Sequence, residues 1–127
     1  MTEVPSAMEK NDISGALRTV LNVLDAWHVP EAHRLTLLGC DPETYNRWLE
    51  TRQLGEALPD TVERLSYILG IYSALQVLFP EPAMADTWIH RPNGAPEFGG
   101  QTPMAVMAQG KIDDLARVRH FLDSWRA

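Results

Sequence analysis

Apolar side chains recur along most of this chain three and four positions apart, which is the spacing of one buried helix face. The first such stripe predicts a helix from about Ser14 to His28. Pro30 ends this stretch, and we expect a short second helix from Glu31 to Leu38 that stops at Gly39 in a left-handed turn. The first stripe consists of Leu17, Val20, Leu21, Leu24 and Trp27.

A third helix is expected to follow directly. Asp41 can accept hydrogen bonds from the free amides at its start, and Pro42 suits the first helical position, where no amide hydrogen is needed. Tyr45, Trp48 and Leu49 are expected on the inward face of this helix, which is predicted to end near Gln53.

The longest apolar stripe predicts a central and largely buried helix from Thr61 to Phe79. Asp60, with Glu63 three residues later, indicates a capping box at its start, and Pro80 ends it. Gly70 in the middle of this helix costs roughly 1 kcal/mol relative to alanine, and it indicates a close contact with another helix.

The last third of the chain is expected to form three more helices around one loop. The first runs from Ala83 to about Ile89 and the last from Lys111 to Trp125. The second begins with Thr102 as a cap before Pro103, extends to Gln109 and has its C-terminal cap at Gly110. No strand-like alternation of useful length occurs, so the sequence predicts an all-α protein of about seven short helices.

The length of 127 residues, of which 45% are hydrophobic, fits one compact unit made of two parts. We expect a flexible N-terminus at 1–13, a helix-turn-helix-like domain at 14–59 and a C-terminal helical domain at 60–127.

Charge is unevenly distributed. The formal net charge is −6, and residues 1–60 hold five basic and ten acidic side chains. Because DNA affinity depends mainly on neutralising phosphates, this acidic half is a poor electrostatic footprint for DNA. No apolar run is long enough for a membrane span, no signal peptide is visible, and the single cysteine, Cys40, allows no internal disulfide. These features predict a cytoplasmic protein.

The stretch Glu31–Trp48 has the spacing of a helix-turn-helix, with a glycine turn between two short helices. In that interpretation Thr44, Asn46 and Arg47 face a groove of DNA. The alternative is a helical hairpin that only shapes the core. Leu35 favours the hairpin, because the two helices usually need a small residue at that position.

A loop rich in proline and glycine, from Arg91 to Gly100, separates two apolar-periodic stretches. Prolines and glycines at this density forbid a helix or a central strand, and a stiff, shaped loop suits a recognition surface. The alternative is a structural corner, in which Asn93 bonds nearby backbone, Pro92 fixes the entry angle and Phe98 plugs the core. Both interpretations can hold together. Trp88, just before the loop, is expected in the core.

The last helix is a second candidate contact. Its outer face, which includes Asp114 and His120, is most simply a solvated face. The helix ends on Trp125 and Arg126, however, and an exposed aromatic ring beside a cation could fill a partner's pocket.

The sequence predicts no catalytic centre, no metal site and no cofactor. None of its four histidines has the spacing of metal ligands, and Cys40 is expected to be a buried and inert thiol. Phosphate-binding loops and serine-nucleophile motifs are missing from the sequence.

Four sequence segments, in the same order along the chain as in a known family, carry a resemblance to that family: Leu65–Tyr72, Leu78–Pro80, Trp88–Pro103 and Arg117–Asp123. The third has the pattern W-x-x-R-P-N-x-x-x-x-F-G-G-x-x-P. From about residue 15 onward the chain closely resembles the Xre/MbcA/ParS family of type II antitoxins, near the ParS branch.

This resemblance implies a RES-domain toxin that consumes NAD or transfers ADP-ribose from it, and an antitoxin that covers the toxin's NAD cleft without being an enzyme. It implies N-terminal helices that often form a homodimer and in some members support operon autoregulation. The alternative function is a repressor that binds operator DNA, alone or with the toxin. The expected toxin-binding residues are Arg91, Pro92, Asn93, Phe98, Gly99 and Gly100, to which the last helix adds Trp125 and Arg126.

Overall fold

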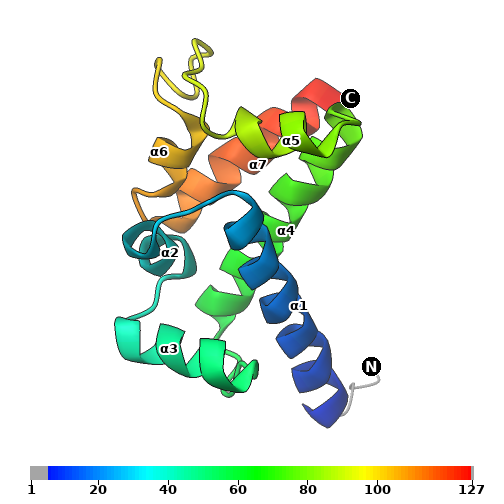
Figure 1. Ribbon diagram of the computed structural model, residues 1–127, viewed down its shortest axis with the longest axis vertical. Coiled ribbons are helices and arrows are strands. Elements are labelled where there is room, and N and C mark those ends of the chain that lie inside the picture. Colours follow the sequence, from blue (N-terminus) through cyan, green and yellow to red (C-terminus); the bar gives the residue numbers. More distant parts are fainter. Residues whose placement is uncertain (1–5, 127) are drawn as a thin grey trace.

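The computed structural model describes residues 6–126, with the side chains of residues 13–125. The described chain consists of helices joined by loops and has no strand, which confirms the all-α prediction (Figure 1). None of its helices combines the length and the apolar content that a bilayer span requires. In chain order the helices are α1 (Ser6–Ala26), α2 (Glu31–Leu38), α3 (Pro42–Thr51), α4 (Pro59–Leu78), α5 (Pro82–Trp88), α6 (Pro103–Met107) and α7 (Ile112–Arg126).

Helix α4 is the central element, as its broad apolar stripe predicts. It packs against α7, α1, α5 and α2, and it runs from the end of the molecule near α3 to the end near the C-terminus (Figure 1). Burial of this stripe supplies much of the hydrophobic stabilisation of the fold. Its buried apolar residues are Leu65, Ile68, Ile71, Ala74 and Leu75.

Two of the predicted helix starts are confirmed, and one is wrong. Asp41 accepts a hydrogen bond from the Thr44 amide at 2.7 Å, and Thr102 accepts one from the Ala105 amide at 3.0 Å. The capping box at Asp60 does not form, because α4 begins at Pro59, two residues before the predicted start, and Leu58 takes the capping position. The Asp60 carboxylate is instead paired with the guanidinium of Arg64 on the next turn, at 2.8 Å.

Helix α1 begins at Ser6, well before the predicted start at Ser14. Residues 6–13 of the expected flexible N-terminus therefore belong to this helix, and residues 1–5 lie outside the described part of the chain. The remaining helix ends agree with the predictions to within a few residues.

Gly70 marks the close helix contact that its position predicts. The side chain of Arg119 on α7 lies directly over it, and a Cβ at this position would overlap the guanidinium. The same guanidinium is bonded to Asp123 on the next turn of α7, at 3.0 Å. The glycine therefore lets a charged side chain cross the interface between α4 and α7.

A buried arginine joins the two halves of the chain. Arg64 on α4, only 8% exposed, donates to the carbonyl oxygens of Thr36 at 3.0 Å and Gly110 at 2.8 Å. Gly39 leaves room for it, since a Cβ there would come within 2.6 Å of the Arg64 Nε. The end of α2, the start of α4 and the turn before α7 are thus fixed around one guanidinium.

Candidate functional site

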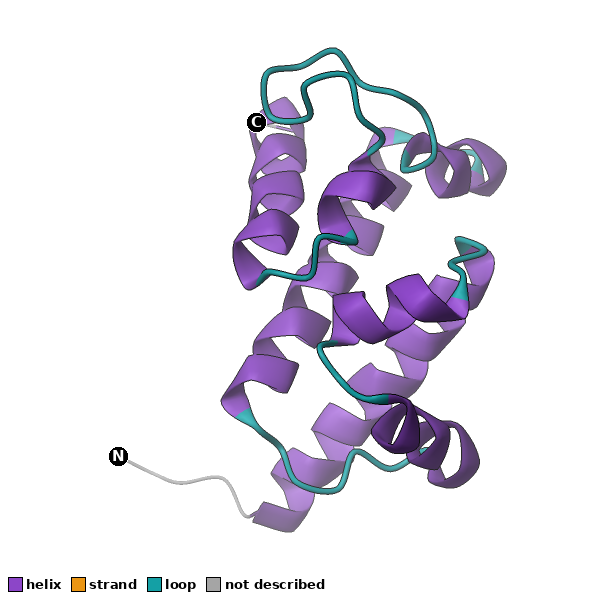
Figure 2. Cartoon of the chain, turned by 90° about the vertical axis from the view of Figure 1, so that its left-hand side faces the viewer, coloured by secondary structure: helices purple, strands orange, loops and turns teal. Residues whose placement is uncertain are grey.

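The loop between α5 and α6 is closed at its neck by backbone hydrogen bonds. Asn93 donates its amide to the Gln101 carbonyl at 3.0 Å, and its carbonyl accepts from Gly100 at 2.8 Å. The Asn93 side chain accepts from the Ala95 amide at 2.9 Å and sets the first turn of the loop. Figure 2 shows the loop at one end of the molecule, together with the C-terminus.

Gly99 and Gly100 make the return turn of this loop. Their φ angles are 56° and 88°, in the region that side-chain-bearing residues rarely adopt. Nothing lies within 4 Å of a Cβ built on either residue. Glycine is therefore required here by the backbone conformation rather than by a neighbouring group.

Phe98 anchors the loop to the core. Its side chain is only 2% exposed, and its ring packs edge-on against Phe121 at 5.0 Å and Trp88 at 5.9 Å between ring centroids. Trp88 is itself buried, which confirms the expectation that it belongs to the core. The position of Phe98 fits the structural corner interpretation, since its ring is not open to a partner in this structure.

Arg91 and Pro92 lie on the exposed side of the loop. The Arg91 guanidinium donates to the Thr87 hydroxyl on α5 at 3.2 Å, so it rests on the surface beside the loop neck. Such a partly oriented cation can form charge-assisted hydrogen bonds with a partner at small entropic cost.

Trp125 extends the same aromatic cluster to the surface. Its ring lies 6.0 Å from Phe121 and 5.8 Å from Phe79 between centroids, yet the side chain is 51% exposed. Phe121 thus links this ring to Phe98 under the loop. Arg126 closes α7, and its side chain lies outside the described part of the chain.

Asp114 departs from its predicted place on the solvated face of the last helix. It is only 3% exposed, because its carboxylate turns back to the start of α7 and accepts from the Lys111 amide at 3.3 Å. His120 is exposed, as expected, and its ring meets Tyr67 edge-on.

The helix-turn-helix-like segment has the predicted turn and the predicted core. Gly39 has a left-handed φ of 64° and ends α2. Leu38, Tyr45 and Trp48 are buried, and the Trp48 indole donates to the Leu54 carbonyl at 3.1 Å. Leu35 is half-buried against this core. Leu49 was wrongly expected on the inward face of α3, because its side chain is 38% exposed.

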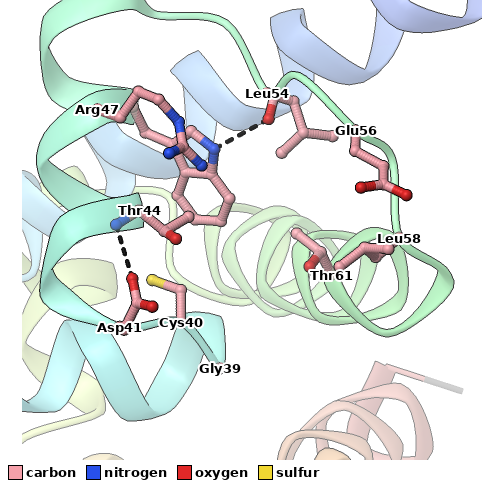
Figure 3. Close-up of a pocket in the computed structure, with 10 residues that line it drawn as sticks. Gly39, Cys40, Asp41, Thr44, Arg47, Leu54, Glu56, Leu58 and Thr61 are labelled. Atoms are coloured by element: carbon pink, nitrogen blue, oxygen red, sulfur yellow. Dashed lines mark hydrogen bonds between the residues drawn. The ribbon is translucent and has the colours of Figure 1, made fainter.

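The three candidate DNA-binding residues are all on α3, and a cavity of about 250 Å³ lies beside two of them. Figure 3 shows Thr44 and Arg47 across this cavity from Glu56. Asn46 is exposed on the same helix. Two carboxylates, Asp41 and Glu56, line the cavity together with the single arginine, so its surroundings do not favour a phosphate.

Cys40 lies in the same cavity wall. Burial raises the pKa of its thiol to about 11, with a further contribution from the carboxylate of Asp41. This protonated thiol agrees with the inert cysteine expected from the sequence, but Cys40 is half-buried rather than buried as predicted.

One grouping of residues is not indicated by metal-ligand spacing along the chain. His28, His33 and His90 line one cavity together, although they come from the turn after α1, from α2 and from the start of the loop. Only the folded arrangement of α2 against the loop neck brings them together, so no local spacing could have indicated it.

A rigid loop beside a fixed, half-exposed tryptophan, on an all-helical frame, defines a protein-binding module. Residues 74–127 match the family described as the antitoxin Xre/MbcA/ParS C-terminal toxin-binding domain. The chain is also 38% identical over 116 residues to the uncharacterized protein y4oB of Sinorhizobium fredii (strain NBRC 101917 / NGR234), in an alignment that covers 90% of this chain and 86% of that protein.

The chain belongs to the Xre/MbcA/ParS family of antitoxins. It is accordingly an antitoxin of the type II kind, and its partner is a toxin. The family match begins inside α4 and contains the loop, α6 and all of α7. The boundary expected at residue 60 stays a prediction.

Proposed function

We propose that this antitoxin neutralises a RES-domain toxin, which consumes NAD or transfers ADP-ribose from it, by covering the toxin's NAD cleft. The observation that carries the proposal is the shared aromatic support of the loop and of Trp125, within the matched toxin-binding domain. One rigid surface can therefore present an apolar anchor at the end of α7 and a cation, Arg91, on the loop.

Neutralisation by occlusion requires no catalytic group in the antitoxin. A loop already held by its own hydrogen bonds loses little conformational entropy on binding, so more of the contact energy appears as affinity. A stable complex of this kind buries roughly 1,200–2,000 Å² in total. In this proposal the chain acts in the cytoplasm as a binding protein, without a cofactor or a catalytic residue of its own.

The proposed contact residues have two different roles. Arg91, Pro92 and Trp125 offer exposed groups to the toxin. Arg126 is proposed as a further contact because it directly follows Trp125 in the sequence. Asn93, Phe98, Gly99 and Gly100 act mainly by holding the loop in shape.

A charge reversal tests this surface. The double substitution Arg91→Glu and Trp125→Ala should weaken toxin binding roughly 1,000-fold, since each removes an exposed anchor of a type that carries about 2 kcal/mol in interfaces. Arg47→Glu, a matched reversal on α3, should bind the toxin as wild type does. A double variant that keeps its helical fold and protects cells from the toxin as well as wild type does would rule this surface out.

A second candidate function is operator binding, alone or with the toxin, by a homodimer. The observation that favours it is the turn at Gly39 between α2 and α3, which has the shape of a helix-turn-helix. Helix α3 lies at the other end of the molecule from the loop (Figure 1), so a toxin on the loop would leave α3 uncovered.

Operator binding has its own test. If Arg47 contacts DNA phosphate, Arg47→Ala should weaken binding and reduce its salt dependence by about one ion. Binding seen only when the toxin is present would favour a co-repressor complex over a repressor acting alone.

A further inference from the structure

We infer that the cavity lined by His28, His33 and His90, here called the histidine cavity, receives a carboxylate side chain of the toxin. The toxin-binding surface then extends from the family's C-terminal domain onto the N-terminal half of the chain. This inference rests on the proposed function, because it concerns the same complex.

The histidine cavity has a volume of about 380 Å³ and lies between the turn after α1, helix α2 and the neck of the loop. All three histidines are exposed to solvent, and Met104 forms a buried part of the wall. An open cavity of this size can receive one or two side chains of a partner. The lining residues are His28, Pro30, His33, His90, Thr102, Met104 and Ala105.

The cavity is continuous with the candidate toxin-binding loop. His90 directly precedes Arg91 at the start of the loop, and Thr102 lies two residues after Gly100 at its end. The Met104 amide donates to the Ile89 carbonyl at 2.9 Å, which fixes both ends of the loop beside the cavity. A protein that covers the loop therefore also comes within reach of His28 and His33, which lie outside the family match at 74–127.

The hydrogen-bonding groups of the cavity suit an anion. The Nε2 of His90 lies 2.5 Å from the Trp27 carbonyl oxygen, and because a carbonyl only accepts, this nitrogen carries a proton. The other ring nitrogen of His90 becomes a donor when the ring takes up a second proton. The side chains of His28 and His33 form no hydrogen bond with other residues in the described part of the chain, so their nitrogens are available to a partner.

The charges around the cavity point to the same partner. None of its lining residues is acidic, although the chain as a whole carries a net charge of −6. On the neighbouring elements, Asp25 is paired with Arg34 at 2.7 Å, while Glu31 and Arg91 are exposed and do not line the cavity. Within the described residues the histidines are not part of a metal-binding group. The interaction that these residues favour is therefore a hydrogen bond between a protonated imidazole and a carboxylate.

The test is the affinity of the purified full-length chain for its toxin, measured by calorimetry between pH 8 and pH 6. Protonation of the imidazoles adds positive charge and hydrogen-bond donors toward a carboxylate, so wild type should bind about tenfold more tightly at pH 6 than at pH 8. The double variant His28→Gln, His33→Gln should bind about tenfold more weakly than wild type at pH 6 and lose most of this pH dependence. His120→Gln, an exposed histidine on α7, is the matched control and should behave as wild type.

Two results of this experiment would overturn the inference. A double variant that binds the toxin with the wild-type affinity and pH dependence overturns it and leaves the proposed function standing. Failure of wild type to bind any RES-domain toxin overturns both. Circular dichroism and urea unfolding of the variants separate a local effect on binding from a loss of the fold.

Discussion

Gly100 shows how a single residue shapes the loop. Its φ of 88° is needed for its amide to reach the Asn93 carbonyl, and open space surrounds the missing side chain. The glycine is therefore important for the backbone conformation of the loop, and any effect of Gly100 on the proposed toxin binding acts through that conformation.

The substitution Gly100→Ala should destabilise the fold by about 1–2 kcal/mol, because an alanine is strained at this φ. Gly94→Ala is the matched control: this glycine is in the same loop and also has free space, but it does not have a φ in the left-handed region. Urea unfolding of both variants measures the difference. Equal stability of the two would show that the loop can turn without its glycine.

Asp41 couples the stability of α3 to pH. Hydrogen bonds from Thr44 lower the pKa of Asp41 below its ordinary value of about 3.9. The Thr44 amide makes the larger contribution and the Thr44 side chain the smaller one. Since the folded pKa is the lower one, the stabilising contribution is complete above the ordinary value and is lost as pH falls through the folded value.

Asp41→Asn keeps a capping side chain and removes the titration. The variant should lose less thermal stability than wild type when the pH falls from 5 to 2, as followed by the unfolding temperature. Glu50→Gln, on the exposed side of the same helix, serves as the control. An acid sensitivity of the Asp41→Asn variant equal to that of wild type would contradict this role of the cap.

At the level of helices and turns, hydrogen bonds from Arg64 on α4 connect α2 with the turn before α7. Its guanidinium satisfies the carbonyls of Thr36 and Gly110, which would lose these hydrogen bonds in its absence. The fold thereby connects the helix-turn-helix-like segment to the toxin-binding domain.

Arg64→Met should destabilise the protein by about 3 kcal/mol, because it removes one partner of a buried, hydrogen-bonded network. Arg18→Met provides the comparison, since the exposed Arg18 donates a single hydrogen bond to the Arg52 carbonyl and its loss should cost under about 0.5 kcal/mol. Urea unfolding measures both. Similar stabilities of the two variants would show that the Arg64 network is dispensable.

The helices could be predicted from the sequence because their signals are local. Pro42 and Pro103, each after a capping side chain, begin α3 and α6, and Gly39 ends α2. The capping box at Asp60 was wrong because α4 begins at Pro59, so Asp60 lies inside the first turn and its carboxylate pairs with Arg64. Local spacing does not reveal which of two acceptable partners a side chain will choose.

The candidate site was predictable only in part. The composition of the loop indicated its stiffness, and Trp125 is exposed as a contact residue should be. The direction of Phe98 could not be settled, because an apolar residue between glycines fits either a contact or a core anchor. The histidine cavity depends on packing between elements distant in sequence, which no periodicity encodes.

At the scale of the whole molecule, the two candidate surfaces lie at opposite ends. The loop and the C-terminus share one end, and α3 lies at the other (Figures 1 and 2). In the account proposed here, one chain could hold a toxin at the first end while the second end is free for a second copy or for an operator.

Occlusion of the NAD cleft can be measured directly as NAD turnover by the proposed RES-domain toxin, with and without the purified chain. The account predicts that the two proteins elute together and that NAD loss falls to background at an equimolar ratio. A stable complex in which the toxin still consumes NAD at its free rate would contradict occlusion of the cleft.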